Sequence, residues 1–167
     1  MNIETFNQLS FAEKQSELFN CCGSRAWSEA LAKINSFKTL DELKNESDRI
    51  WFSLSEKDWK EAFSHHPKIG DVEGLKKKFA STAEWASGEQ SKVREASEVI
   101  LSELKENNDA YENKFGYIFI VCATGKSAEE MLALLKKRLI NNPAFEGRVA
   151  AEEQNKITHL RLDKLFA

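Results

Sequence analysis

Helix-start signals recur along this chain more regularly than any other feature. At four candidate helix starts, a serine or threonine is followed three residues later by an acidic residue, a pattern called the capping box. In it the two side chains satisfy backbone amides at the first turn of a helix. The pairs are Ser10 with Glu13, Thr39 with Glu42, Ser127 with Glu130 and, in a weaker form, Ser55 with Asp58. Apolar residues at helical spacing follow each pair, so four helices are expected to begin here.

Similar spacing predicts a short helix around Trp27, a longer one from about Gln90 to Leu104, and a last one from Phe145 to Leu165. Residues 115–123, FGYIFIVCA, are aromatic and β-branched like a strand. No convincing second strand pattern exists to pair with them, and a lone strand would leave backbone groups unpaired. A buried helix is therefore expected at 115–123. Seven glycines and two prolines in 167 residues leave few helix breaks. The prediction is one compact all-α domain, residues 1–167.

Composition limits the classes of function. The net charge is -3, and lysines are interspersed with acidic residues, so no basic surface for nucleic acid is expected. The sequence contains no apolar run of about 18 residues, so no membrane-spanning helix is expected. The N-terminal MNIETFNQLS is too polar for a secretory signal. Cys21, Cys22 and Cys122 lack CxxC spacing, which favours free thiols in a reducing cytoplasm. We expect a cytoplasmic protein without nucleic-acid or membrane partners.

The segment SHHPKIGD, residues 64–71, contains two of the three histidines and one of the two prolines. Because the residue before proline avoids helical geometry, the helix that begins near Ser55 should stop at His66. The His66 ring could then enter a cleft as a proton-transfer group; alternatively, it only complements the helix dipole. On a helix, His65 and His66 would point about 100° apart, which does not suit chelation of one metal ion. No metal site is expected.

Two further segments contain candidate binding groups. Glu89 and Gln90 open a helix, where an acidic residue in the first turn is ordinary. Their carboxylate and amide could also recognise the edges of a urea-like ligand. Arg161 lies between Leu160 and Leu162 in the last helix. It either covers the edge of the core with its stem or binds a carboxylate or oxyanion through its guanidinium.

In their combination and order, these segments resemble one family. HPKIGD follows a helix with Trp and Phe, a Glu-Gln pair opens a helix, and KFGYIFIVCATGKS and ITHLRL come later. The pattern resembles the decarboxylases of 2-oxo-4-hydroxy-4-carboxy-5-ureidoimidazoline (OHCU), which act in urate breakdown. The resemblance extends over nearly the whole chain, from NQLSFAEKQSELFNCCGSRAW onward. Its most specific part is the HPxIGD block.

This resemblance implies an all-helical, cofactor-free, usually dimeric enzyme that converts OHCU to (S)-allantoin and carbon dioxide. The catalytic histidine of the family falls on His66, its substrate-binding acid on Glu89, and the arginine of its final helix on Arg161. These three are the expected catalytic residues. The expected substrate-binding residues are Pro67, Ala86, Ser87, Gly88, Glu89, Gln90, Phe119, Ile120, Val121, Cys122 and Ala123.

Two positions depart from the family pattern. Lys68 stands where the family usually has arginine, which keeps the charge but changes the geometry. Ala86 stands where the family usually has serine, and Ser87 follows one place later. These departures would also fit a second interpretation, a non-catalytic helical domain that binds a ligand or a protein. Measuring whether the protein turns over OHCU discriminates an enzyme from a non-catalytic binding domain.

Overall fold

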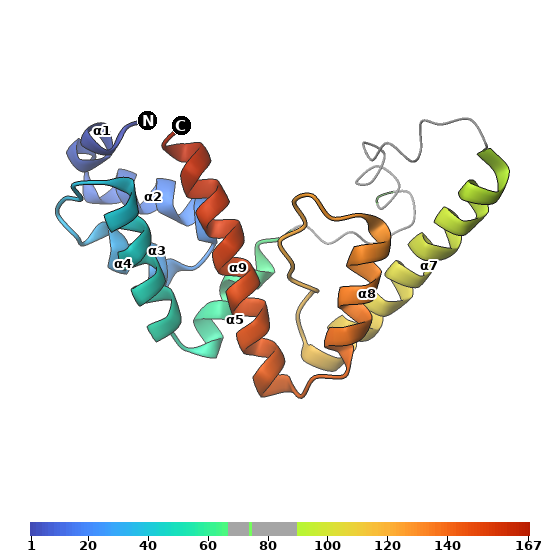
Figure 1. Ribbon diagram of the computed structural model, residues 1–167. Helices are drawn as coiled ribbons and strands as arrows, with labels where there is room; N and C mark the ends of the chain where they lie inside the picture. The colour runs from blue at the N-terminus through green and yellow to red at the C-terminus, as the bar shows by residue number, and fades with distance from the viewer. Residues whose placement is uncertain (67–73, 75–89) are drawn as a thin grey trace. The chain divides into compact units, whose positions relative to one another are not determined.

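The computed structural model describes residues 1–66, 74 and 90–167, and side chains in the last range from residue 97 onward (Figure 1). Its described residues contain helices and no strand. The helices are α1 (Ile3–Gln8), α2 (Phe11–Cys22), α3 (Arg25–Ala32), α4 (Leu40–Ser53), α5 (Glu56–Ser64), α7 (Gln90–Phe115), α8 (Ala128–Leu139) and α9 (Pro143–Leu165). The predicted all-α fold class is confirmed.

The predicted helix starts are present. Both halves of the capping box form at the starts of α2, α5 and α8, where the capping residues are Ser10, Ser55 and Ser127. At the start of α4, Thr39 accepts a hydrogen bond from the Glu42 amide at 3.1 Å. The Glu42 carboxylate instead accepts from the amide of Lys38 at 2.6 Å. Local hydrogen bonds therefore place these four starts where the sequence pattern predicts them.

The prediction of a buried helix over residues 115–123 is wrong. Helix α7 continues past the predicted Leu104 and ends at Phe115, where Gly116 takes the left-handed conformation with φ +80°. Residues 116–127 form neither helix nor strand. The amide of Cys122 donates a 2.7 Å hydrogen bond to the Glu153 carboxylate on α9. A distant side chain thus satisfies backbone here, so this segment needs no regular structure of its own.

The described residues group into two compact units. The first comprises residues 1–66, 120–122 and 147–167, and therefore contains α1 to α5 and most of α9. Large apolar side chains from all of these helices are buried in it. They include Phe6, Leu18, Trp27, Leu31, Leu43, Trp51, Phe63 and Leu162.

Buried tryptophans fix helices of the first unit to one another through their indole N–H groups. Trp27 on α3 donates to the backbone carbonyl of Ser47 on α4 at 3.2 Å. Trp51 on α4 donates to the carbonyl of Ala151 on α9 at 2.9 Å. Trp59 on α5 donates to the carbonyl of Trp51, also at 2.9 Å. Each indole therefore combines apolar burial with a specific hydrogen bond, and the end of α5 is held relative to α4 and α9.

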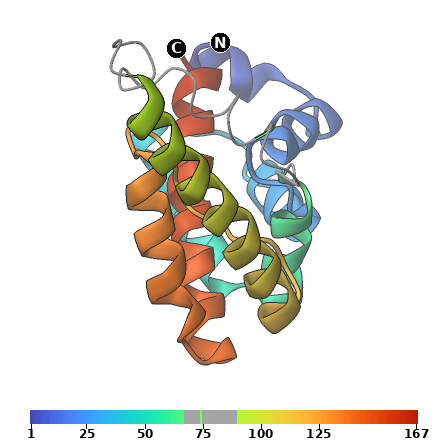
Figure 2. The ribbon, with the colours of Figure 1, turned by 90° about the vertical axis from the view of Figure 1, so that its right-hand side faces the viewer.

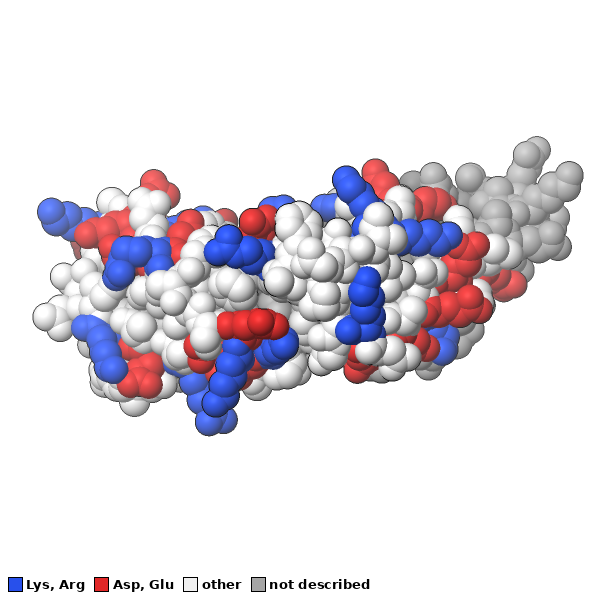
Figure 3. Space-filling model, turned by 90° about the horizontal axis from the view of Figure 1, so that it is seen from below, with Lys and Arg blue, Asp and Glu red and all other residues white. Residues whose placement is uncertain are grey.

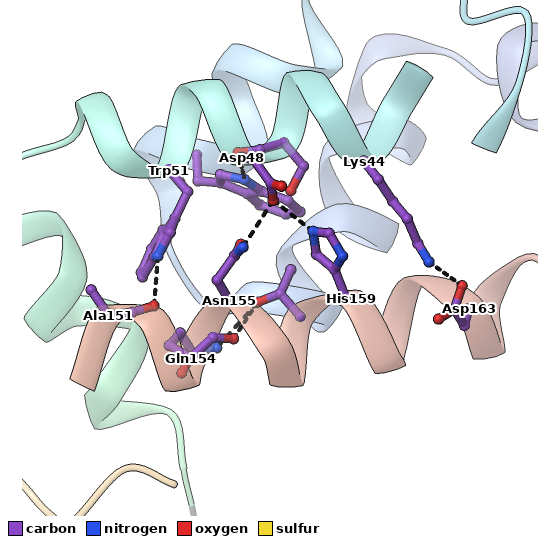
Figure 4. Close-up of polar contacts among 11 residues, drawn as sticks. Lys44, Asp48, Trp51, Ala151, Gln154, Asn155, His159 and Asp163 are labelled. Atoms are coloured by element: carbon purple, nitrogen blue, oxygen red, sulfur yellow. Dashed lines mark hydrogen bonds and ion pairs between the residues drawn. The ribbon is translucent and has the colours of Figure 1, made fainter. Parts of the chain in front are cut away.

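Polar contacts also join α4 to α9 (Figure 4). Asp48 on α4 accepts a 2.8 Å hydrogen bond from the Asn155 amide group and contacts Nε2 of His159 at 2.6 Å. Lys44 and Asp163 form an ion pair one helical turn further along. These contacts connect α4 to α9, which carries several residues of the candidate site.

The second unit comprises residues 67–119 and 123–146, and in it α7 and α8 lie side by side (Figures 1 and 2). Glu146 is fully buried and pairs with Arg138, whose Nε lies 2.7 Å from the carboxylate. Asn141 donates to the other carboxylate oxygen at 2.8 Å, and the Tyr111 hydroxyl also donates to Glu146. Burial, together with this bond, raises the pKa of Tyr111 above its usual value. The buried charge is thus paired and hydrogen-bonded.

Basic and acidic side chains are interspersed over most of the face drawn in Figure 3. Oppositely charged side chains also pair along single helices, as Lys33 does with Glu29 and Lys60 with Glu56, both at 2.7 Å. Such exposed pairs contribute little to stability. Within the described part of the chain, no helix combines the length and apolar character that crossing a membrane would need.

Candidate functional site

The two adjacent histidines lie just after α5 and have different surroundings. His65 caps α5, and its ring stands edge-on to Phe19 with the ring centroids 5.1 Å apart. His66 follows, half-buried, and its Nε2 lies 2.5 Å from Oε1 of Gln154 on α9. Helix α5 ends at Ser64, two residues before the predicted stop at His66. His65 packs against α2, whereas His66 contacts a buried polar group.

The C-terminus of α2 supplies backbone acceptors to this region. Gly23 ends the helix in the left-handed conformation, with φ +84°. The carbonyl groups of the two preceding residues then accept from side chains of α9. Arg161 donates from Nη1 to the carbonyl of Cys21 at 3.2 Å, and Gln154 donates from Nε2 to that of Cys22 at 3.3 Å. A cation at a helix C-terminus also complements the helix dipole.

Residues Gln154, Thr158 and Arg161 are spaced by four and three positions, so they lie along one face of α9. Gln154 and Thr158 have no exposed surface. Arg161 was predicted as a site residue from the sequence, whereas Gln154 was not. A usable signal existed, because Gln154 precedes Arg161 by two helical turns and therefore lies on the same helix face.

The segment 120–122 belongs to the same unit as His66 and Arg161. Its Cys122 amide donates to the carboxylate of Glu153, the residue directly before Gln154. Two successive residues of α9 thus contact two separate predicted parts of the site, with Gln154 bonded to His66 and Glu153 bonded to the 120–122 segment. Ile120 is buried, while Val121 and Cys122 are half-buried. Glu153 was also missed, because no local pattern links it to Cys122.

The two ends of the predicted lining segment belong to the second unit. The Phe119 ring lies 4.6 Å from the guanidinium of Arg138 and 5.2 Å, centroid to centroid, from the ring of Tyr111. Phe119 therefore packs on the buried ion pair of that unit. Ala123 is half-buried. Of the predicted lining, only residues 120–122 share a unit with His66.

Several predicted site residues lie outside the described residues. Gln90 is the first residue of α7, and its side chain is not among those described. The others outside the described residues are Pro67, Lys68, Ala86, Ser87, Gly88 and Glu89.

Cys21 and Cys22 are buried free thiols at the end of α2. Burial raises the pKa of Cys21 to about 11 and that of Cys22 to about 12. Both are therefore neutral near pH 7, and a neutral thiol is a poor nucleophile. They are packing residues here. Among the described residues, no three His, Cys, Asp or Glu side chains are grouped so that they could hold a metal ion.

The chemistry available in this part of the chain is proton transfer and charge placement. His66 supplies an imidazole, a side chain that proteins often use for proton transfer. Arg161 uses one guanidinium nitrogen on the Cys21 carbonyl, and the fork geometry of the group suits an anionic oxygen.

Comparison with known proteins gives consistent matches. Residues 7–163 match the model of the OHCU decarboxylase family. The uric acid degradation bifunctional protein TTL of Arabidopsis thaliana is 39% identical over 150 residues; the match covers 88% of this chain but 45% of that protein. The chain thus spans less than half the length of this curated relative.

Two solved structures have a similar fold. One is the crystal structure of an OHCU decarboxylase in the presence of (S)-allantoin, which matches with a TM-score of 0.70 and 38% identity over 90% of this chain and 96% of that one. The other is an (S)-allantoin synthase with a TM-score of 0.74 and 21% identity, over 100% of this chain and 54% of that one. The second match bears on the fold alone.

Proposed function

Because the chain belongs to the OHCU decarboxylase family, we propose that it converts OHCU to (S)-allantoin and carbon dioxide in the breakdown of urate. The observation that carries this proposal is the match to a solved OHCU decarboxylase with (S)-allantoin. This chain is 38% identical to that structure and spans 96% of it. The family resemblance also supports one catalytic domain, a homodimer and a cytoplasmic location, all of which are part of the proposal.

The substrate's own chemistry explains how such a reaction proceeds without a cofactor. As the bond to the carboxylate breaks and carbon dioxide leaves, its electron pair forms a carbon–carbon double bond in the ring. The adjacent ring C=N accepts the displaced electrons, and its nitrogen takes a proton. The resulting enol then loses its hydroxyl proton and gains a proton on carbon. Delivery of that proton to one face gives a single enantiomer, so the protein's tasks are positioning and proton transfer.

His66 is the proposed general acid and base of this sequence. It is half-buried, directly follows a helix end, and is hydrogen-bonded to Gln154. An imidazole ring can accept a proton at one nitrogen and donate one from the other. It can therefore take the hydroxyl proton and deliver a proton to carbon.

The remaining residues are proposed to bind and orient the substrate. Glu89 and Gln90 would hold its ureido and ring edges, because a carboxylate and an amide provide matching acceptors and donors. Arg161 would stabilise the carboxylate or the enolate-like oxygen. The 120–122 segment, held to α9 by Glu153, would line the substrate. The assignments of Pro67 and of 86–88 rest on the family resemblance.

The reaction is tested by generating OHCU in place. Urate oxidase and 5-hydroxyisourate (HIU) hydrolase convert urate to OHCU. Circular dichroism then follows the appearance of optically active allantoin when this protein is added. OHCU decays spontaneously to racemic allantoin, so we expect both a faster reaction and an excess of the (S) enantiomer. No acceleration together with a racemic product would contradict the proposal and favour a non-catalytic binding domain.

A further inference from the structure

Gln154 contacts His66 and has no exposed surface, although a glutamine side chain is rarely buried without a specific role. Its Oε1 lies 2.5 Å from Nε2 of His66. Its Nε2 lies 3.3 Å from the backbone carbonyl of Cys22 and 3.3 Å from Oγ1 of Thr158. All four residues belong to the first unit.

These neighbours determine which way the amide of Gln154 faces. The Cys22 carbonyl can only accept a hydrogen bond, so it requires the nitrogen of the amide. The Thr158 hydroxyl donates its hydrogen to the backbone carbonyl of Gln154 at 3.0 Å, so it too accepts from that nitrogen. The opposite orientation would place the amide oxygen against the Cys22 carbonyl oxygen. The amide oxygen of Gln154 therefore faces His66.

An amide oxygen can only accept, so the hydrogen of this bond belongs to Nε2 of His66. In a neutral imidazole, one nitrogen carries the hydrogen and the other carries the lone pair. We propose that Gln154 is a positioning residue that holds neutral His66 as its Nε2–H tautomer, so that Nδ1 is the nitrogen that exchanges the proton in catalysis. The assignment of Nδ1 to catalysis rests on the proposed decarboxylation, whereas the tautomer follows from the orientation of the Gln154 amide.

A neutral amide suits this role better than a carboxylate would. It accepts from the ring N–H both when the ring is neutral and when it is protonated. A carboxylate in the same place would favour the charged imidazolium and would make the proton harder to release. Gln154 therefore fixes the ring's orientation and leaves the ring able to cycle between its two protonation states.

Nuclear magnetic resonance of protein labelled with ¹⁵N in its three histidines tests the tautomer without any substrate. A His66→Asn spectrum assigns the resonances. Above the pKa of the ring, we expect Nε2 to show a bonded hydrogen protected from exchange with water, and Nδ1 to show the shift of an unprotonated nitrogen. A hydrogen on Nδ1 in the neutral ring would overturn the inference even if the protein decarboxylates OHCU. The expected spectrum in a protein without turnover would overturn the proposed function instead and leave the tautomer assigned.

Two variants on α9 form a matched pair. Gln154→Leu removes the acceptor, and Asn155→Leu removes the neighbouring amide, which bonds Asp48 instead. We expect Gln154→Leu to lose the protected Nε2 hydrogen and to lower kcat by up to about 10²-fold with a smaller change in KM. Asn155→Leu should keep both the His66 resonances and kcat. A protected Nε2 hydrogen that persists in Gln154→Leu, or an equal loss of kcat in both variants, would contradict the positioning role.

Discussion

A β-carbon added to Gly23 would lie 3.0 Å from the β-carbon of His65, so the end of α2 and the end of α5 fit together only because residue 23 is glycine. Gly23 also has φ +84°, a conformation that other residues adopt at a cost. Gly23→Ala therefore combines backbone strain with crowding beside His66. We expect it to lower the free energy of unfolding by about 2–4 kcal/mol, measured by urea denaturation.

Gly116 is the matched control for this prediction. It has a similar φ of +80°, but an added β-carbon would meet nothing within 4 Å. Gly116→Ala should therefore cost only the backbone part, about 1–2 kcal/mol. Equal losses at the two positions would show that the contact with His65 does not constrain residue 23.

Glu153 holds the 120–122 segment through the amide of Cys122. Glu153→Ala leaves a part-buried N–H without this acceptor, and such a loss costs about 1–3 kcal/mol. Glu153→Gln keeps an acceptor oxygen and should retain most of the stability. The exposed neighbour variant Glu152→Ala should change the free energy of unfolding by less than about 0.5 kcal/mol. If urea denaturation finds Glu153→Ala as stable as Glu152→Ala, the segment is held in another way.

The buried pair of Arg138 and Glu146 predicts a large effect in the second unit. Arg138→Met leaves the Glu146 carboxylate buried without its cation, which should lower the free energy of unfolding by about 3–5 kcal/mol. Tyr111→Phe removes a single hydrogen bond to the same carboxylate and should cost less, about 1–3 kcal/mol. Thermal and urea denaturation of both variants check which substitution lowers the free energy of unfolding more. A smaller loss for Arg138→Met than for Tyr111→Phe would contradict it.

The buried thiols predict a loss of stability at alkaline pH. Burial raises the pKa of Cys22 from 9.0 to about 12 and that of Cys21 to about 11. Below pH about 8 the thiols are neutral in the folded and the unfolded chain and have no effect on the pH dependence. Above pH 9.0 they ionise first in the unfolded chain, so the free energy of unfolding falls as the pH rises toward the folded pKa values.

Urea denaturation with a reducing agent, from pH 8 to pH 10.5, measures this slope. Cys22→Ala should flatten it because that variant removes the thiol with the most strongly raised pKa. Parallel slopes for wild type and Cys22→Ala would mean that this thiol is not protected from ionisation.

The parts of the fold that depend on neighbouring residues could be predicted from the sequence. Ser10, Ser55 and Ser127 begin helices because their partners lie three residues away. The irregular segment before Ala123 could not be predicted, because the acceptor for the Cys122 amide is on α9. Aromatic and β-branched composition indicates burial there, but it does not indicate which group forms a hydrogen bond with the backbone.

The candidate site likewise contains residues that could be identified from the sequence and residues that could not. His66 was identifiable because the following proline stops the helix and because HPxIGD resembles a known family. Gln154 is distant in sequence from His66 and approaches it only once α4, α5 and α9 are joined by Trp51 and Trp59. Which nitrogen of His66 carries the hydrogen depends on the Cys22 carbonyl of yet another helix.

The most direct test of the account compares three proteins in the circular dichroism assay of (S)-allantoin formation: wild type, His66→Asn and His65→Asn. Both variants should keep the helical far-ultraviolet spectrum. His66→Asn should lower turnover by at least about 10²-fold, the lower limit of what general acid–base catalysis is worth. His65→Asn should retain most of the turnover, because His65 packs on Phe19, whereas Gln154 bonds His66. Near-normal turnover in His66→Asn would contradict the assignment of His66 as the proton-transfer residue.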